Sequence, residues 1–143
     1  MKDLPASVKC LFPPSTDLSR LGALSTSEGT AQAAAQIVIA CVGGLTVGAT
    51  GPGTEQAASD IEFHPDMRQG RQIVVRPWHQ RLGDLVSVAD AHHAHIMLFV
   101  DSKGSFYAFT DPDDKLYALG PFDQAVEKLL LGLDFGKPVE PDS

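Results

Sequence analysis

A short apolar run that stops at a turn and returns as an aromatic strand is the feature that most constrains the fold. The run, Ile96 to Val100, is short enough for a buried strand. Asp101-Ser102-Lys103-Gly104 is a strong turn signal, and Ser105 to Thr110 follows as the hairpin partner. Strands joined by so short a connection pair antiparallel, because a parallel pair needs a long crossover. The sequence therefore predicts an antiparallel sheet.

An amphipathic helix is predicted after this hairpin. Pro121 suits its first turn and Gly132 its end. Polar residues occupy the opposite side, so one face should pack on the sheet. The apolar residues that repeat at helical spacing are Phe122, Ala125, Val126, Leu129, Leu130 and Leu133.

A second helix is predicted before the hairpin. Ser25 to Glu28 fits a capping box, in which the Ser hydroxyl and the Glu carboxylate satisfy free amide groups. The helix should run to about Val42 and end at Gly43-Gly44, because glycine adopts the left-handed conformation at helix ends. Further strands are expected at 45–49, 59–63, 85–88 and 116–119. Residues 71–75 fit either a strand or the approach to a helix at 78–82.

These elements add up to an α+β fold, a single domain with an antiparallel sheet packed against two or three helices. We expect an irregular N-terminal arm over 1–24, the α+β domain over 25–136 and a polar tail over 137–143. Trp78 is interpreted as a core residue, since large aromatic side chains mostly supply buried area. Periodicity predicts a core that contains Ile37, Val38, Cys41, Leu98, Val100, Phe106, Val126, Leu129 and Leu130.

Charge narrows the class of partner. The chain has 143 residues and a net charge of −7, and residues 101–143 hold nine acidic and four basic residues. Nucleic-acid binding usually requires a basic surface, so this balance argues against it and permits a basic protein partner. Two cysteines make no disulfide framework, and the N-terminus lacks a signal-peptide pattern. No membrane span is expected, and the predicted location is the cytoplasm.

Three histidines in four residues form the most tempting chemical cluster. His92, His93 and His95 lie beside Asp90, and His64 or His79 could complete a metal site. The spacing matches no metal motif, so we interpret the segment as a solvated loop and expect no metal. No nucleophile elbow or phosphate loop occurs either. We therefore expect no catalytic residues and no cofactor, and a protein that is not an enzyme.

Five short segments follow one another in an order that resembles the SUKH superfamily, and most of all its third immunity family. The resemblance covers roughly 31–136. Val42 stands where the family commonly has an aromatic residue, and the family's N-terminal helix with an Ala-Gly-Trp segment is not visible in 1–24. The segments are Val42-Gly43-Gly44-Leu45, Phe63-His64-Pro65, Leu82-Gly83 followed by Leu85–Val88, Asp101–Tyr107, and Leu129-Leu130-Leu131-Gly132.

This resemblance implies a non-catalytic bacterial immunity protein that binds and neutralises a cognate secreted or contact-dependent toxin, often a nuclease. The alternatives are a regulatory or scaffolding protein-binding module and, third, a metal-dependent enzyme that uses the histidine cluster. An acidic surface would suit a basic nuclease, because charge complementarity speeds association. The acidic residues predicted to bind the partner are Glu62, Asp90, Asp111, Asp113 and Asp114.

Overall fold

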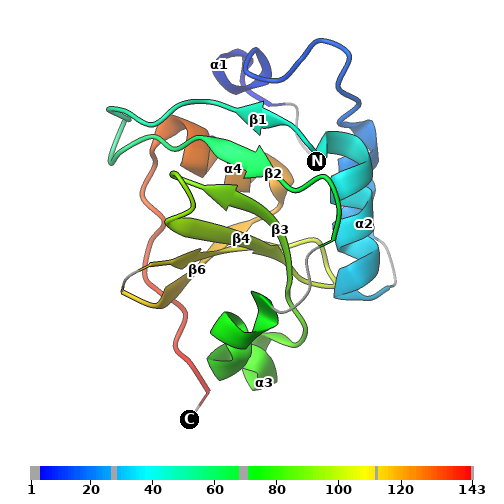
Figure 1. The fold of residues 1–143 in the computed structure, drawn as a ribbon, viewed down its shortest axis with the longest axis vertical. Helices are drawn as coiled ribbons and strands as arrows, with labels where there is room; N and C mark the ends of the chain where they lie inside the picture. Colours follow the sequence, from blue (N-terminus) through cyan, green and yellow to red (C-terminus); the bar gives the residue numbers. More distant parts are fainter. Residues whose placement is uncertain (1–3, 27–28, 68–70, 112, 143) are drawn as a thin grey trace.

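The computed structural model contains one antiparallel sheet whose strand order follows the chain from β1 to β6 (Figure 1). It describes residues 4–26, 29–67, 71–111 and 113–142. The predicted α+β fold with an antiparallel sheet in a single domain is confirmed. Within the described residues the strands are β1 (Thr46–Val47), β2 (Ile61–Phe63), β3 (Val86–Ala91), β4 (Ile96–Val100), β5 (Phe106–Thr110) and β6 (Lys115–Gly120). The predicted hairpin is β4–β5.

Helices lie on both sides of this sheet. Side chains of α2 and α4 share one apolar cluster with the sheet, whereas side chains of η2 belong to a second cluster. In Figure 1, α4 passes behind the sheet and α3 lies at its lower end. None of the helices in the described part of the chain is long and apolar enough to cross a bilayer. The helices are α1 (Ala6–Lys9), η1 (Ser19–Thr26), α2 (Ala31–Val42), η2 (Arg71–Trp78), α3 (His79–Leu82) and α4 (Phe122–Leu131), of which η1 and η2 are 3₁₀ helices.

The start of α2 differs from the prediction, whereas its end at Val42 agrees. The N-cap is Thr30, whose hydroxyl accepts a hydrogen bond from the Ala33 amide at 3.1 Å. Residues 25–26 belong to η1, and the remaining residues of the expected capping box, 27–28, lie outside the described residues. The helix therefore begins at Ala31 with Thr30 as its N-cap, and the predicted start after Ser25 is wrong.

Two glycines allow α2 to end against the sheet. A Cβ at Gly43 would lie 2.4 Å from the Ile39 carbonyl oxygen, which real side chains do not tolerate. Gly44 has a φ of +82°, which favours glycine, and its amide donates to the Phe63 carbonyl at 3.1 Å. The left-handed residue is thus Gly44, and the Gly-Gly pair joins the helix end to β2.

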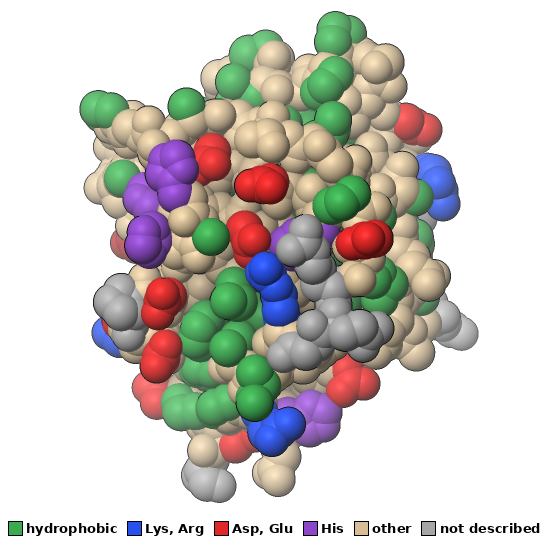
Figure 2. Space-filling view, in the orientation of Figure 1, with side chains coloured by type: hydrophobic (Ala, Val, Ile, Leu, Met, Phe, Trp, Pro, Cys, Tyr) green, Lys and Arg blue, Asp and Glu red, His purple; other side chains and the backbone are tan. Residues whose placement is uncertain are grey.

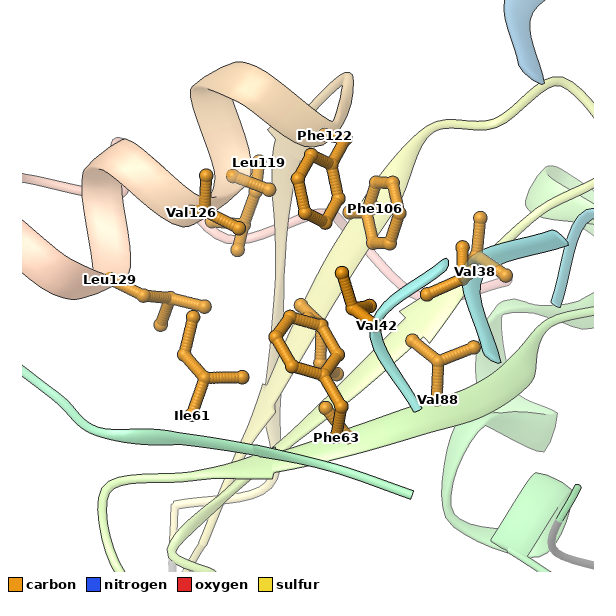
Figure 3. Close-up of a cluster of buried hydrophobic side chains, with 14 of the residues drawn as sticks. Val38, Val42, Ile61, Phe63, Val88, Phe106, Leu119, Phe122, Val126 and Leu129 are labelled. Carbon is orange, nitrogen blue, oxygen red and sulfur yellow. The ribbon is translucent and has the colours of Figure 1, made fainter. Parts of the chain in front are cut away.

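Aromatic rings meet at the centre of the larger cluster. Phe122 lies 5.7 Å from Phe106 and 6.3 Å from both Phe63 and Phe12, measured between ring centroids. Figure 3 shows Phe122, Phe106 and Phe63 directed toward one another from α4, β5 and β2. Such tilted and edge-on pairs contribute beyond their buried area.

Most of the predicted core is buried, with two corrections on α2. Ile37 and Cys41 are only partly buried and pack at the margin of the cluster. The buried face of α2 consists mainly of alanines, whose small side chains let the helix lie close to the sheet. The predicted residues that are buried are Val38, Leu98, Val100, Phe106, Val126, Leu129 and Leu130. The buried residues of α2 are Ala31, Ala34, Ala35, Val38 and Val42.

The N-terminal segment adds apolar side chains to this core although its sequence shows no clear period. Five of them are buried, and Phe12 reaches the ring of Phe122. The pattern was not visible in the sequence because one-turn helices and 3₁₀ turns give no sustained spacing of apolar residues. The five are Leu4, Val8, Phe12, Leu21 and Leu24.

The second cluster covers part of the other sheet face. Trp78 is buried, as predicted, and its ring packs edge-on against Phe109 at 6.2 Å. The Trp78 indole N–H donates to the Val139 carbonyl at 2.8 Å, and the Val139 amide donates to the Leu116 carbonyl at 2.7 Å. The carboxylate of Asp142 accepts from the amides of residues 80 and 81 at 2.8 and 3.0 Å. Residues 139–142 therefore tie α3 to the edge of the sheet.

We predict that Leu129→Ala lowers the free energy of unfolding by about 2–5 kcal/mol, because Leu129 is fully buried between α4 and the sheet. Leu11→Ala is the matched control, since Leu11 is 38% exposed and should change that value by about 0.5 kcal/mol or less. Denaturant unfolding of both variants measures the difference. Equal stability of the two variants would contradict the packing of α4.

Tyr107 should make stability depend on pH in the alkaline range. Burial, together with the Asp101 carboxylate 3.3 Å from the phenol oxygen, raises the pKa of Tyr107 from 10.0 to about 12. The unfolded chain therefore releases this proton first, and stability falls as pH rises from about 10 to about 12. Unfolding free energies measured across this interval should fall less steeply in Tyr107→Phe than in the unsubstituted protein. Identical slopes would refute the shift.

Candidate functional site

The predicted acidic residues lie toward one end of the sheet. Glu62 of β2 and Asp90 of β3 are direct cross-strand partners, so their side chains leave the same face. The other three candidates, Asp111, Asp113 and Asp114, lie in the turn between β5 and β6 and are exposed. The β3–β4 turn adjoins this turn, because the Asp111 amide donates to the His95 carbonyl at 2.9 Å. The fold thus brings the five residues to neighbouring strands and turns.

Asp90 differs from the four exposed candidates because its carboxylate is partly buried in an ion pair with Arg71. Arg71 of η2 donates to both carboxylate oxygens, at 2.5 and 3.4 Å. Both side chains are partly buried, with 24% and 18% of their surface exposed, so water screens this pair less than a surface pair. Glu62 is exposed beside it. The guanidinium therefore neutralises the Asp90 carboxylate and leaves Glu62 as the exposed acidic side chain of this cross-strand pair.

The β5–β6 turn holds its carboxylates outward. Thr110 donates its hydroxyl proton to the Asp113 carboxylate at 2.5 Å, which fixes one acidic side chain. Asp114 has a φ of +55°, a left-handed conformation that Asp tolerates better than most residues do. Asp111 and Asp114 are exposed at the same tip. A partner that approaches this end of the sheet meets concentrated negative charge.

The histidine cluster forms a tight turn rather than a strand. His92, His93 and Ala94 have φ values of +52°, +53° and +69°. The imidazole of His92 is 3.2 Å from the Ser59 hydroxyl and that of His93 is 3.1 Å from the Thr50 hydroxyl, so neighbouring rings engage different residues. Within the described residues no group of three or more His, Cys, Asp or Glu side chains is placed to hold a metal ion.

The histidines considered as further ligands lie elsewhere. His64 is 2% exposed, and its Nε2 atom is 3.0 Å from the Ser87 hydroxyl. His79 lies on α3, with its Nδ1 atom 3.6 Å from a carboxylate oxygen of Asp84. The fold therefore does not gather either of these residues with the β3–β4 turn into a ligand set.

Two cavities are lined by histidines. One of about 280 Å³ includes Ser59 and His92. The nearby Asp60 carboxylate accepts from the His93 amide at 3.2 Å, so it does not orient the His92 imidazole as a triad acid would. The other, of about 350 Å³, lies between η2 and α3. Its lining residues are Gln72, Val75, Arg76, His79, Gly83, Asp84 and Leu85, with no serine or cysteine nucleophile.

Sequence reasoning missed the contribution of η2 to this face. Residues 71–75 fit two alternatives by pattern, and neither placed Arg71 against Asp90. The sequence does contain one signal for this segment, the group of basic residues around Trp78. Tryptophan and arginine are both enriched in protein interfaces.

We predict that the purified, untagged protein carries no stoichiometric zinc or nickel, because the His93 imidazole lies on the Thr50 hydroxyl while the His92 and His95 rings are 6.4 Å apart between centroids. Elemental analysis measures the metal content directly. A metal content near one per chain that disappears in a His93→Ala, His95→Ala double variant would refute this reading of the turn.

Comparison with known proteins gives one result. The chain matches the model of a family described as SUKH-3 immunity protein over residues 25–132. No curated protein and no solved structure matches it. The matched range spans every strand from β1 to β6 together with α2 and α4, which is well over half of the chain. The chain therefore belongs to the SUKH-3 immunity protein family.

Proposed function

We propose that this protein is a non-catalytic immunity protein, which binds a cognate toxin in the cytoplasm and neutralises it by direct contact. The observation that carries the proposal is the match to an immunity family over the whole sheet. Within the described residues, no three His, Cys, Asp or Glu side chains are placed to hold a metal ion, and Asp60 accepts from the His93 amide. An inhibitor of this kind acts stoichiometrically.

The acidic end of the sheet is the proposed contact region. Glu62 is exposed on the sheet face, and the β5–β6 turn presents exposed carboxylates beside the β3–β4 turn. These charges attract a basic partner over roughly 10 Å at 0.1 M salt and speed its association. A nuclease toxin, which needs a basic surface to hold nucleic acid, suits such a contact.

We expect the cognate toxin to be encoded beside this gene, and we predict that co-expression with it protects cells, whereas the toxin alone kills them. Cell survival, scored together with the amount of folded immunity protein, measures protection. Death of cells that contain well-folded immunity protein would refute immunity.

We further predict that reversing Asp113 and Asp114 to Lys lowers the on-rate for the toxin and weakens its dependence on salt. The matched control reverses Glu127 and Glu140, which changes the net charge equally at positions in α4 and after it, outside the β5–β6 turn. Stopped-flow association at several salt concentrations compares the two variants. Equal on-rates for both would discard the acidic turn as a contact and leave immunity itself intact.

A further inference from the structure

Ile73 is held outward on the partly covered face of the sheet. Its side chain is 62% exposed, although it lies in the middle of η2. The residues around it are fixed inward: Arg71 pairs with Asp90, and Val75 and Trp78 are buried in the second cluster. In the described part of the chain, the exposed large hydrophobic side chains are Ile73 and Leu11, and Leu11 is only 38% exposed. The exposure of Ile73 is therefore imposed by contacts on both sides of it.

The sheet face that η2 covers in part combines apolar side chains with acidic ones, and the exposed Arg76 of η2 adds a basic group three residues from Ile73. Along one row of the sheet, Glu62 pairs with Asp90, Asp90 with Met97 and Met97 with Phe109, so all four leave the same face. Met97 is partly buried against the second cluster, to which η2 also contributes. Figure 2 shows hydrophobic side chains gathered on this face over the region between β4 and α3, with acidic side chains around them.

This arrangement has the composition of a protein-binding surface. Interfaces commonly consist of an apolar centre with a polar border, and a few central side chains supply most of the binding energy. A lone exposed isoleucine would need no explanation, but this one protrudes beside an ordered Arg–carboxylate pair and a charged border. A nucleic acid would be repelled by the carboxylates, and so would a second copy of a chain whose net charge is −7.

We infer that Ile73 is the apolar anchor of the toxin contact, and that the Arg71–Asp90 pair positions it. The occupant is a protein whose surface offers an apolar pocket with Lys and Arg side chains on the side that meets Glu62 and the β5–β6 turn. This inference rests on the proposed function and deepens it, because it places the centre of the contact on η2 and the acidic turns at its border. Arg71 acts as a positioning residue, since it fixes the start of η2 against β3.

The test compares Ile73→Ala with Leu11→Ala in binding to a catalytically inactive form of the neighbouring toxin. Both changes truncate an exposed side chain, so both variants should melt like the unsubstituted protein. We expect Ile73→Ala to weaken binding about tenfold or more, and Leu11→Ala to leave Kd within about twofold. Calorimetry or surface plasmon resonance measures both. Equal affinities of the two variants would overturn the anchor.

Two results separate this inference from the proposed function. If the unsubstituted protein does not bind the toxin at all, the proposed function fails. If it binds and Ile73→Ala binds equally well, only the anchor fails. A dimer of the free protein that Ile73→Ala dissociates, seen by light scattering, would also overturn the inference, because the occupant would then be a second copy.

The positioning role of Arg71 has its own test. Arg71→Asp should weaken toxin binding, because two carboxylates would then repel η2 from β3. The double variant Arg71→Asp, Asp90→Arg swaps the two charges, so it restores their attraction while each position carries the opposite of its original charge. Recovery of most of the affinity supports positioning. If the folded exchange variant binds no better than Arg71→Asp, then Asp90 or Arg71 contacts the toxin directly and the positioning role is wrong.

Discussion

The ring of Phe122 holds together parts of the chain that are distant in sequence. Phe12 comes from the N-terminal segment, Phe63 from β2 and Phe106 from β5, and all three rings lie within 6.3 Å of Phe122 between centroids. Because Phe122 opens α4, its position also fixes where that helix crosses the sheet. The buried face of the fold depends on this contact, which no local pattern encodes.

The two faces of the sheet are covered to different extents. One face forms the main core, and the other is partly open to a partner. Helices α2 and α4, with α1 beyond, bury one face completely enough that its side chains form the larger cluster. The other face is covered by η2, α3 and residues 139–142, which leaves Glu62 and Ile73 exposed beside it. A sheet packed on one side and partly open on the other can present a rigid surface, and rigidity reduces the entropy lost on binding.

Regular spacing made the centre of the fold predictable from sequence. The β4 strand, the β4–β5 hairpin and α4 all follow strong periodicity or turn signals, and the structure places them within one or two residues of the prediction. The predicted start of α2 was wrong, because the hydroxyl of Thr30, and not a residue of the Ser25 segment, caps the helix. The 3₁₀ helix η2 and the packing of the N-terminal segment were not predictable, since both depend on contacts between distant residues.

The candidate site shows the same limit. Composition and turn signals led to Asp111, Asp113 and Asp114 as candidates, because charges at hairpin tips are readable in sequence, whereas Glu62 and Asp90 were chosen because they flank predicted strands. The Arg71–Asp90 pair and the outward direction of Ile73 could not be predicted from sequence, because both depend on where η2 lies on the sheet. The glycines of the segments that carry the family resemblance explain why the resemblance reports on fold. Gly43 and Gly44, for example, allow the end of α2 to approach β2 closely.

Hydrogen–deuterium exchange of the protein, free and bound to its toxin, tests the central claim that the partly covered sheet face is the binding surface. The account predicts new protection in η2 (Arg71–Trp78) and in the β3–β4 and β5–β6 turns, with little change in α2. Amides in exposed turns exchange fast enough in the free protein for protection to be measured. Protection confined to α1 and α2, with η2 and both turns unchanged, would contradict it.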